Sequence, residues 1–145
     1  RAGREEVPGE VLIQTRHPDH PLMQQVAGPY DKALPELLAQ RRRRGLPPYG
    51  ALGVIRCDSL SRQEGLDFLE RLKRNVATAE NCQLIGPLPA AMARRKNRYR
   101  SQLVLAASGR AALAASMAPL VKVAVSTRHS HRLNWSVDID PYESL

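Results

Sequence analysis

A cluster of basic residues in the second half of the chain gives the clearest signal for binding chemistry. Its members are cations with one aromatic residue among them: Arg94, Arg95, Lys96, Arg98, Tyr99 and Arg100. Cations neutralise phosphates, and an aromatic ring can stack on an unpaired base. The pattern favours contact with DNA, and the alternative is a solvated loop with Tyr99 in the core.

A second candidate is Arg110, which follows Ser108 and Gly109 where we expect a helix to begin. Helix N-termini and guanidinium groups both attract carboxylates. Arg110 could therefore hold an acidic partner segment, or it could be a surface arginine without a partner.

Arg1 and Arg4 lie three residues apart around a glycine, so that two guanidinium groups could reach one phosphate. The alternative is a frayed terminus.

Metal and nucleophile chemistry find little support. His17 and His20 are three residues apart, but no cysteine or further histidine lies near them, and a capped turn is the simpler interpretation. Cys57 and Cys82 are isolated and are expected to be buried thiols. We predict no metal site. A small stand-alone enzyme has no support, because the sequence offers no Ser-His-Asp spacing, no close carboxylate pair and no Cys-His neighbours.

Composition narrows the classes of partner. The 145 residues carry a net charge of +8 and are 43% hydrophobic, with 4% aromatic residues. An excess of basic residues favours an anionic binding partner: DNA, RNA, an acidic peptide or a membrane surface. No apolar run approaches the roughly 18–20 residues of a membrane span, and the charged first residues are not a secretory signal. We expect a cytoplasmic protein.

The stretch from Arg41 to Gly50 divides the chain. Its four arginines suit the negative end of a helix dipole, and Gly45 can adopt the positive φ of a residue that follows a helix. Pro47 and Pro48 then favour an extended exit. The arginines are either a solvated helix end or a basic rim beside a nucleic-acid path.

Before this junction we expect a strand over Glu10–Thr15, a helix after Pro21, and a second helix from about Tyr30 or Leu34 to Arg44. One strand and two helices cannot enclose a core alone. We therefore expect residues 1–45 to complete a larger body whose other part precedes Arg1.

After the junction, the apolar spacing predicts alternating strands and helices. Strands are expected at 51–58, 82–90, 99–106 and 133–140, and helices at about 61–79 and 110–122. A capping box, Ser61 with Glu64, opens the first of these helices. This β-α-β-β-α-β order is typical of a ferredoxin-like α+β domain over residues 46–145. Both helices should cover one sheet face and leave the other open to water or a partner.

The sequence resembles the C-terminal part of the PriA family of bacterial replication-restart DNA helicases. The resemblance covers the whole chain and rests on several short motifs: RAGR, PGEVLIQT, HPDHPLMQ, YDKALPELLAQRRRRGLPPYG, LIGPLPA and WSVDIDP. It implies that residues 1–45 end a second RecA-like helicase lobe. It also implies that the following domain has a fold similar to ribosomal protein S10.

The resemblance further implies an ATP-dependent 3′→5′ helicase that recognises stalled forks and restarts replication with other primosome proteins. Arg4 matches the arginine finger of helicase motif VI, and Arg1 matches the other arginine of that motif. Both could act only with the missing lobe. No GxxxxGK[ST] cradle for ATP lies in this chain. ATP, Mg²⁺ and structural Zn²⁺ are therefore expected on residues upstream, with no cofactor here and no activity in the fragment alone.

The implied partners are forked or single-stranded DNA and the acidic, hydrophobic C-terminal tail of the single-stranded DNA-binding protein. Arg110 matches the family arginine that meets this tail. The implied location is the bacterial cytoplasm, at the nucleoid, without a membrane partner. An S10-like RNA- or protein-binding module without an enzymatic role is the alternative, because this fold hosts many functions.

Overall fold

The computed structural model describes residues 10–21, 23, 26, 28–129 and 131–141. The chain divides into two compact units, Arg1–Leu38 and Ala39–Leu145. Arg1 and Arg4 lie outside the described residues.

The strand expected at Glu10–Thr15 does not form. These residues are neither helix nor strand, and the side chain of Leu12 is 89% exposed. A strand needs the backbone of a neighbour to complete its hydrogen bonds, and no described segment pairs with this one. The prediction from β-rich composition was therefore wrong for this unit.

Helix α2, Tyr30–Arg43, begins before Pro35, so the alternative start at Leu34 was wrong. The expected stop at Gly45 is confirmed. Gly45 has a φ of +60°, its N–H donates to the carbonyl of Arg42, and the N–H of Leu46 donates to the carbonyl of Arg41. These two bonds are the Schellman pattern, which satisfies carbonyl groups at a helix end. The guanidinium of Arg41 also donates to the carbonyl oxygen of Pro47, 3.0 Å away.

The second unit has the expected order of strands and helices. Its elements are β1 (Ala51–Ser59), α3 (Arg62–Arg74), β2 (Cys82–Arg95), β3 (Arg98–Ala107), α4 (Arg110–Ser126) and β4 (Asn134–Ile139). The strands form one sheet in the order β2-β3-β1-β4, and every neighbouring pair is antiparallel. This topology confirms the α+β, ferredoxin-like prediction.

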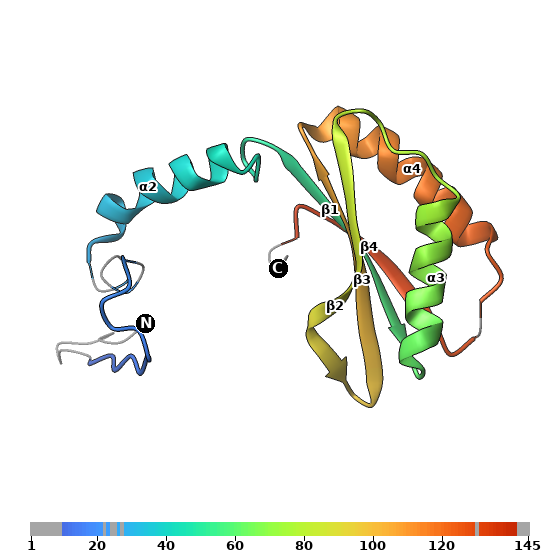
Figure 1. The fold of residues 1–145 in the computed structure, drawn as a ribbon, viewed down its shortest axis with the longest axis horizontal. Coiled ribbons are helices and arrows are strands. Elements are labelled where there is room, and N and C mark those ends of the chain that lie inside the picture. The colour runs from blue at the N-terminus through green and yellow to red at the C-terminus, as the bar shows by residue number, and fades with distance from the viewer. Residues whose placement is uncertain (1–9, 22, 24–25, 27, 130, 142–145) are drawn as a thin grey trace, which may run out of the picture. The chain divides into compact units, whose positions relative to one another are not determined.

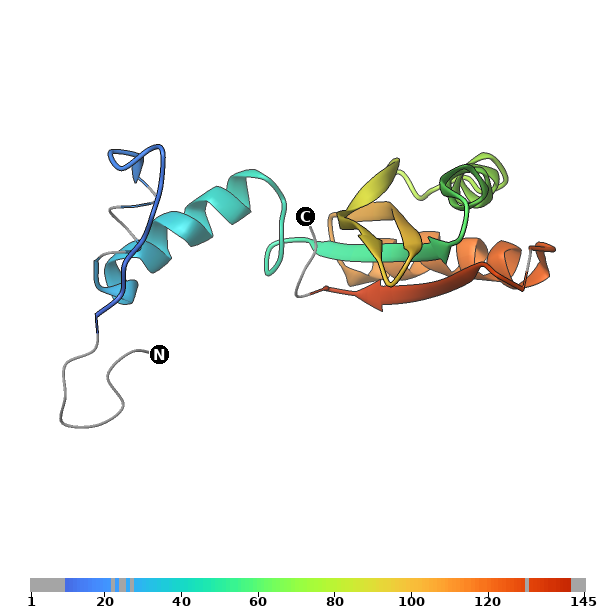
Figure 2. The ribbon, with the colours of Figure 1, turned by 90° about the horizontal axis from the view of Figure 1, so that it is seen from below.

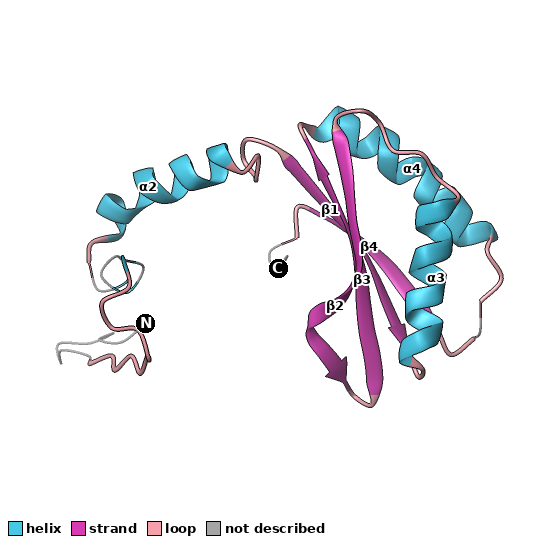
Figure 3. Ribbon diagram, viewed as in Figure 1, coloured by secondary structure: helices cyan, strands magenta, loops and turns pink. Residues whose placement is uncertain are grey.

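Helices α3 and α4 cover the same face of the sheet, as predicted. Both pack on β1 and β3, and they contact each other. Figure 1 shows them on one side of the strands, and Figure 3 shows the two layers by colour. The main core lies between these layers and includes Ile55, Phe68, Leu103 and Leu120, all fully buried. Burial of such side chains stabilises the unit by about 1.5–3 kcal/mol each.

No described helix covers the second face of the sheet, yet the centre of that face is buried. Leu52, Val54 and Val104 have almost no exposed surface, although they lie outside the main core cluster. Two ion pairs lie beside them, Arg56 with Asp138 and Arg100 with Asp58. The centre of this face is therefore closed to water, while the two ion pairs beside it stay partly exposed.

Two helix bounds differ from the prediction. Ser61 caps α3 as expected, because its hydroxyl accepts from the N–H of Glu64. The helix stops at Arg74 rather than near Ala79, and the side chain of Asn75 donates to the carbonyl of Arg71 instead of extending the helix. Helix α4 runs through Pro119 to Ser126, four residues beyond the expected end.

Candidate nucleic-acid interface

The basic cluster lies on the β2–β3 hairpin, as predicted, but not on a long loop. Arg95 pairs with Arg98, so only Lys96 and Asn97 form the turn. Both have positive φ, 48° and 62°. A two-residue turn of this kind matches the twist of the strands that it joins. The turn holds the basic side chains on a defined hairpin end.

Two irregularities bend the outer half of β2. The register with β3 shifts between Ile85 and Leu88 and again between Pro89 and Arg94. Figures 1 and 2 show this part of β2 bending out of the sheet. Extra residues on one strand raise local twist and can redirect side chains. The hairpin end is therefore separated from the flat part of the sheet.

The structure divides the predicted DNA-binding residues into two groups. Arg98 and Arg100 are tied to the protein. The guanidinium of Arg98 donates to the carbonyl oxygens of Arg132 and Asp58, and that of Arg100 lies 3.3 Å from a carboxylate oxygen of Asp58. Their side chains are partly buried. These two arginines hold the hairpin on the sheet and are not free to neutralise phosphates.

The second group remains available at the surface. Arg95 and Lys96 are exposed, and within the described part of the chain neither has a side-chain partner. Arg94 is also exposed, but it lies over the ring of Tyr99 at 5.2 Å and donates to Asn97. Tyr99 is half-buried and lies neither in the core nor fully in solvent. Of the predicted set, Arg95 and Lys96 have the clearest freedom to bind an anion.

The pairing of Arg95 with Arg98 is electrostatically unfavourable. Like charges directly opposite in an antiparallel pair destabilise the pair. The guanidinium of Arg98 donates to two backbone carbonyls, whereas the side chain of Arg95 is exposed at the surface. This arrangement therefore suits an anionic partner better than it suits the stability of the hairpin.

Arg110 lies at the other end of the sheet, at the start of α4. Its side chain is 87% exposed and 3.5 Å from a carboxylate oxygen of Asp140. The opposite oxygen of Asp140 accepts from the N–H of Leu52, which ties this carboxylate to β1. Gly109 provides no side-chain cap for α4. The first N–H groups of α4 and the guanidinium of Arg110 thus share one site suited to a carboxylate.

An apolar groove of about 700 Å³ begins beside Arg110. It lies between α4 and β4, and its apolar lining includes Leu113, Met117, Val137 and Ile139. Ile139 is exposed here, although its alternation along β4 predicted an inward position. Its side chain lies on the same face of the sheet as Leu113 and Met117 of α4, but half of it stays exposed at this edge strand. This groove could not be predicted from the sequence, since helical and strand spacing assign the same residues to the core.

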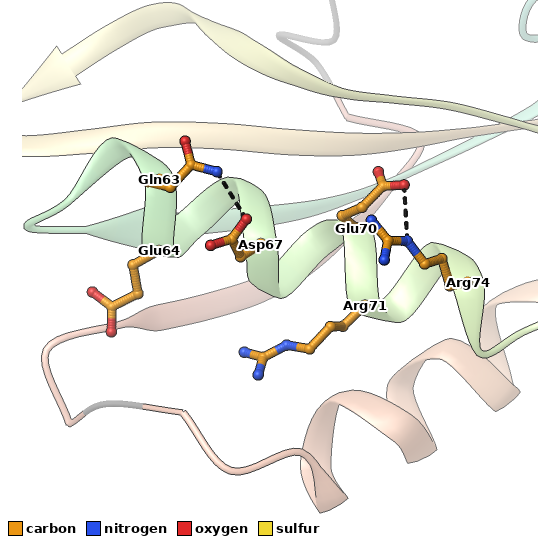
Figure 4. A pocket seen from close by; sticks show the side chains of 6 residues that line it. All are labelled: Gln63, Glu64, Asp67, Glu70, Arg71 and Arg74. Atoms are coloured by element: carbon orange, nitrogen blue, oxygen red, sulfur yellow. Dashed lines mark hydrogen bonds and ion pairs between the residues drawn. The ribbon is translucent and has the colours of Figure 1, made fainter.

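A further cavity lies beside α3 and is lined by charged side chains. Figure 4 shows two pairs along this helix. Gln63 donates to Asp67, and Arg74 lies 3.4 Å from Glu70. Such pairs, four residues apart, are typical of a solvated helix face and contribute only about 0.2–0.5 kcal/mol each. This cavity offers no free charge pattern comparable to that of the hairpin.

Nowhere in the described ranges do three His, Cys, Asp or Glu side chains gather as a metal site. None of the described helices is long and apolar enough to cross a membrane. Cys57 is buried, and burial, with the charges of Asp58 and Glu64, raises the pKa of its thiol to about 12. A thiol in this state is a poor nucleophile and metal ligand.

These features define a class: a small α+β domain with a basic hairpin at one end of its sheet and an arginine-flanked apolar groove at the other. Residues 42–142 match the family described as the primosomal protein N C-terminal domain. The match covers more than half of the chain, and the chain belongs to this family.

Individual relatives agree. A Replication restart protein PriA of Synechocystis sp. is 36% identical over 112 residues, which are 72% of this chain and 13% of the relative. Proteins of the same name from Haemophilus influenzae and Bacillus subtilis are 29% and 28% identical over 99% and 98% of this chain. The chain spans at most about a fifth of the length of these three relatives.

Proposed function

We propose that this chain is the C-terminal part of a replication-restart DNA helicase and that its β2–β3 hairpin contacts DNA. The observation that carries the DNA contact is the pair of exposed cations at the hairpin turn, Arg95 and Lys96, for which the described part of the chain provides no side-chain partner. Family membership supplies the biological setting. In this setting, the parent protein recognises forked or single-stranded DNA and assembles the primosome in the bacterial cytoplasm, at the nucleoid.

ATP hydrolysis belongs to the parent protein in this proposal. Arg4 would act as the arginine finger and Arg1 as its motif partner, both facing a nucleotide held by a preceding lobe. In this proposal ATP, Mg²⁺ and Zn²⁺ are bound by other parts of the parent protein, since the sequence of this chain holds no GxxxxGK[ST] cradle for the phosphates. Finding that the isolated chain hydrolyses ATP would contradict this assignment.

The DNA contact can be tested by fluorescence anisotropy with forked DNA, single-stranded DNA and a structured RNA in competition. The wild-type chain should prefer DNA, and its affinity should fall steeply with salt and depend little on sequence. The Arg95→Glu/Lys96→Glu variant should lose most of this affinity. Adding Arg94→Glu should weaken it further.

The matched control reverses two exposed cations elsewhere, Lys122→Glu with Arg128→Glu, which changes the net charge equally. Equal losses in the two double variants would mean that net charge, not the hairpin, attracts DNA. A preference of the wild type for RNA would favour the alternative, an S10-like RNA-binding module.

A second candidate role is docking of the acidic, hydrophobic C-terminal tail of the single-stranded DNA-binding protein. It is favoured by the guanidinium of Arg110 beside the groove of Leu113, Met117 and Ile139. A chain-terminal carboxylate would meet Arg110 and the start of α4, and apolar side chains would fill the groove. The groove is open, so we expect weak binding to this chain alone.

Two substitutions that should change the affinity in opposite directions test this role, with binding of a tail peptide measured by calorimetry. Arg110→Ala should weaken binding, because it removes the cation. Asp140→Asn should strengthen it, because it removes a competing carboxylate and keeps an oxygen that can accept from Leu52. Unchanged affinity in both variants would remove Arg110 from the site.

A further inference from the structure

A small cavity lies inside the bend of the β2–β3 hairpin. Pro89 pairs with Ser101, and Arg94 pairs with Tyr99, so residues 90–93 of β2 face a single residue of β3. The extra residues open a space of about 180 Å³ between the strands and the start of α3. Bulges of this kind are frequent beside functional sites.

The walls of this cavity combine apolar surfaces with guanidinium groups. Its lining consists of Arg62, Pro89, Ala93, Arg94, Tyr99, Arg100 and Ser101. Pro89, Ala93 and the ring of Tyr99 are the apolar part. Arg100 is fixed by Asp58. Arg62 is exposed and has no side-chain partner in the described ranges, so it is the cation at the rim that is free to bind an anion.

The volume limits what can enter. At about 30 Å³ per water in the liquid, 180 Å³ corresponds to about six waters. That is room for one flat base and not for a stacked pair. An aromatic wall with a free cation at the rim fits a ligand that joins a flat ring to a phosphate. A nucleotide of a DNA strand has this chemistry, and the neighbouring Arg95 and Lys96 suit the adjacent phosphates.

We propose that this cavity takes one unpaired base of a DNA strand, stacked on Tyr99, with its phosphate on Arg62. The inference rests on the proposed DNA contact of the hairpin and names the part of the DNA that it recognises. A fork or junction exposes unpaired bases, whereas a continuous duplex does not.

Arg94 must move for the base to stack on the ring face that it covers now. Its contact with Tyr99, at 5.2 Å, is an exposed cation–π contact. Stacking of a base on an aromatic side chain is generally the stronger of the two interactions. The exchange therefore favours the base, and the released Arg94 gains a phosphate.

The test uses the full chain and three DNA duplexes that differ at one position: fully paired, with one extra thymine, and with an abasic extra nucleotide. The last two carry the same phosphates. The wild type should bind the extra thymine about tenfold more tightly than the abasic duplex, the factor that about 1.4 kcal/mol of stacking gives. Ala93→Leu, which fills the cavity from an exposed position, should remove this preference and keep the salt-dependent binding.

The matched control is Ala91→Leu, on the same strand but outside the cavity lining, which should keep the preference. Tyr99→Phe should keep it too, because the ring remains. Equal binding of the thymine and abasic duplexes by the wild type would overturn the proposal, as would a full preference in Ala93→Leu. Absence of salt-dependent binding to all three duplexes would instead refute the DNA contact itself.

Discussion

Lys96 occupies the left-handed backbone region, with a φ of 48°, at the first turn position of the β2–β3 hairpin. This conformation costs an ordinary L-residue roughly 1–2 kcal/mol, whereas glycine adopts it freely. We predict that Lys96→Gly raises the free energy of unfolding by about 0.5–1 kcal/mol in urea titrations and weakens DNA binding. A loss of stability would show that the lysine side chain stabilises the turn. Asn97→Gly, at the neighbouring position with a φ of 62°, should also stabilise the turn, and it removes no cation.

The second residue-scale prediction concerns Cys57, whose thiol pKa rises from 9.0 to about 12 mainly through burial. Because the folded pKa lies above the unfolded one, the unfolded state ionises first. The protonated thiol therefore contributes to stability below about pH 9, and this contribution is lost as pH rises towards 12. Between pH 8 and 10.5, stability should fall more steeply in the wild type than in Cys57→Ala. Parallel pH profiles would contradict the shift, since the two proteins differ only at this thiol.

Residue roles were the hardest part to predict from sequence. Arg98 and Arg100 looked equivalent to Arg95 and Lys96, but their partners Asp58 and Arg132 lie some 34–42 positions away in the chain. Only the folded sheet brings these groups together. Arg62 was not predicted as a DNA-binding residue for the same reason. Its position beside the hairpin depends on where β1 ends in the folded sheet.

At the scale of elements, one buried hydroxyl joins two segments. Ser116 on α4 is fully buried, and its oxygen accepts from the N–H of Ala79, 3.0 Å away, in the connection from α3 to β2. Ser116→Ala would leave that N–H without its partner, which costs about 1–3 kcal/mol. We predict this loss in thermal or urea unfolding. Ser126→Ala, at an exposed hydroxyl, should change stability by less than about 0.5 kcal/mol. Equal effects would show that the Ala79 connection does not depend on Ser116.

Element order was predictable because apolar spacing and caps are local. The N-cap at Ser61 and the glycine at position 45 were both confirmed. Bounds and pairings were less predictable. The strand expected at Glu10–Thr15 had suitable composition but no partner, and α4 continued through Pro119 because its buried face outweighs one lost hydrogen bond. Tertiary packing, which a short sequence window does not contain, decided each case.

At the scale of the whole molecule, the net charge of +8 does not say where on the surface an anionic partner binds. The fold decides this, because it pairs some charges and leaves others exposed. Asp58, Asp138 and Asp140 each engage an arginine on the sheet or at the start of α4. On α3, Glu70 pairs with Arg74, and Asp67 accepts from Gln63. The cations without partners at the hairpin turn are thus a local excess, which is the condition for a directed rather than a diffuse attraction of DNA.

This division of charges predicts how salt should affect each variant. Each phosphate neutralised contributes about 0.7 to the slope of log affinity against log salt for single-stranded DNA. Arg95→Gln/Lys96→Gln should therefore flatten the slope by about 1.4 and leave stability nearly unchanged. Arg98→Gln/Arg100→Gln should leave the slope nearly unchanged and lower the stability, because these arginines bind Asp58 and Arg132 rather than phosphates. If both double variants flatten the slope equally, Arg98 and Arg100 also contact phosphates despite their internal contacts. The hairpin would then bind DNA with all four cations.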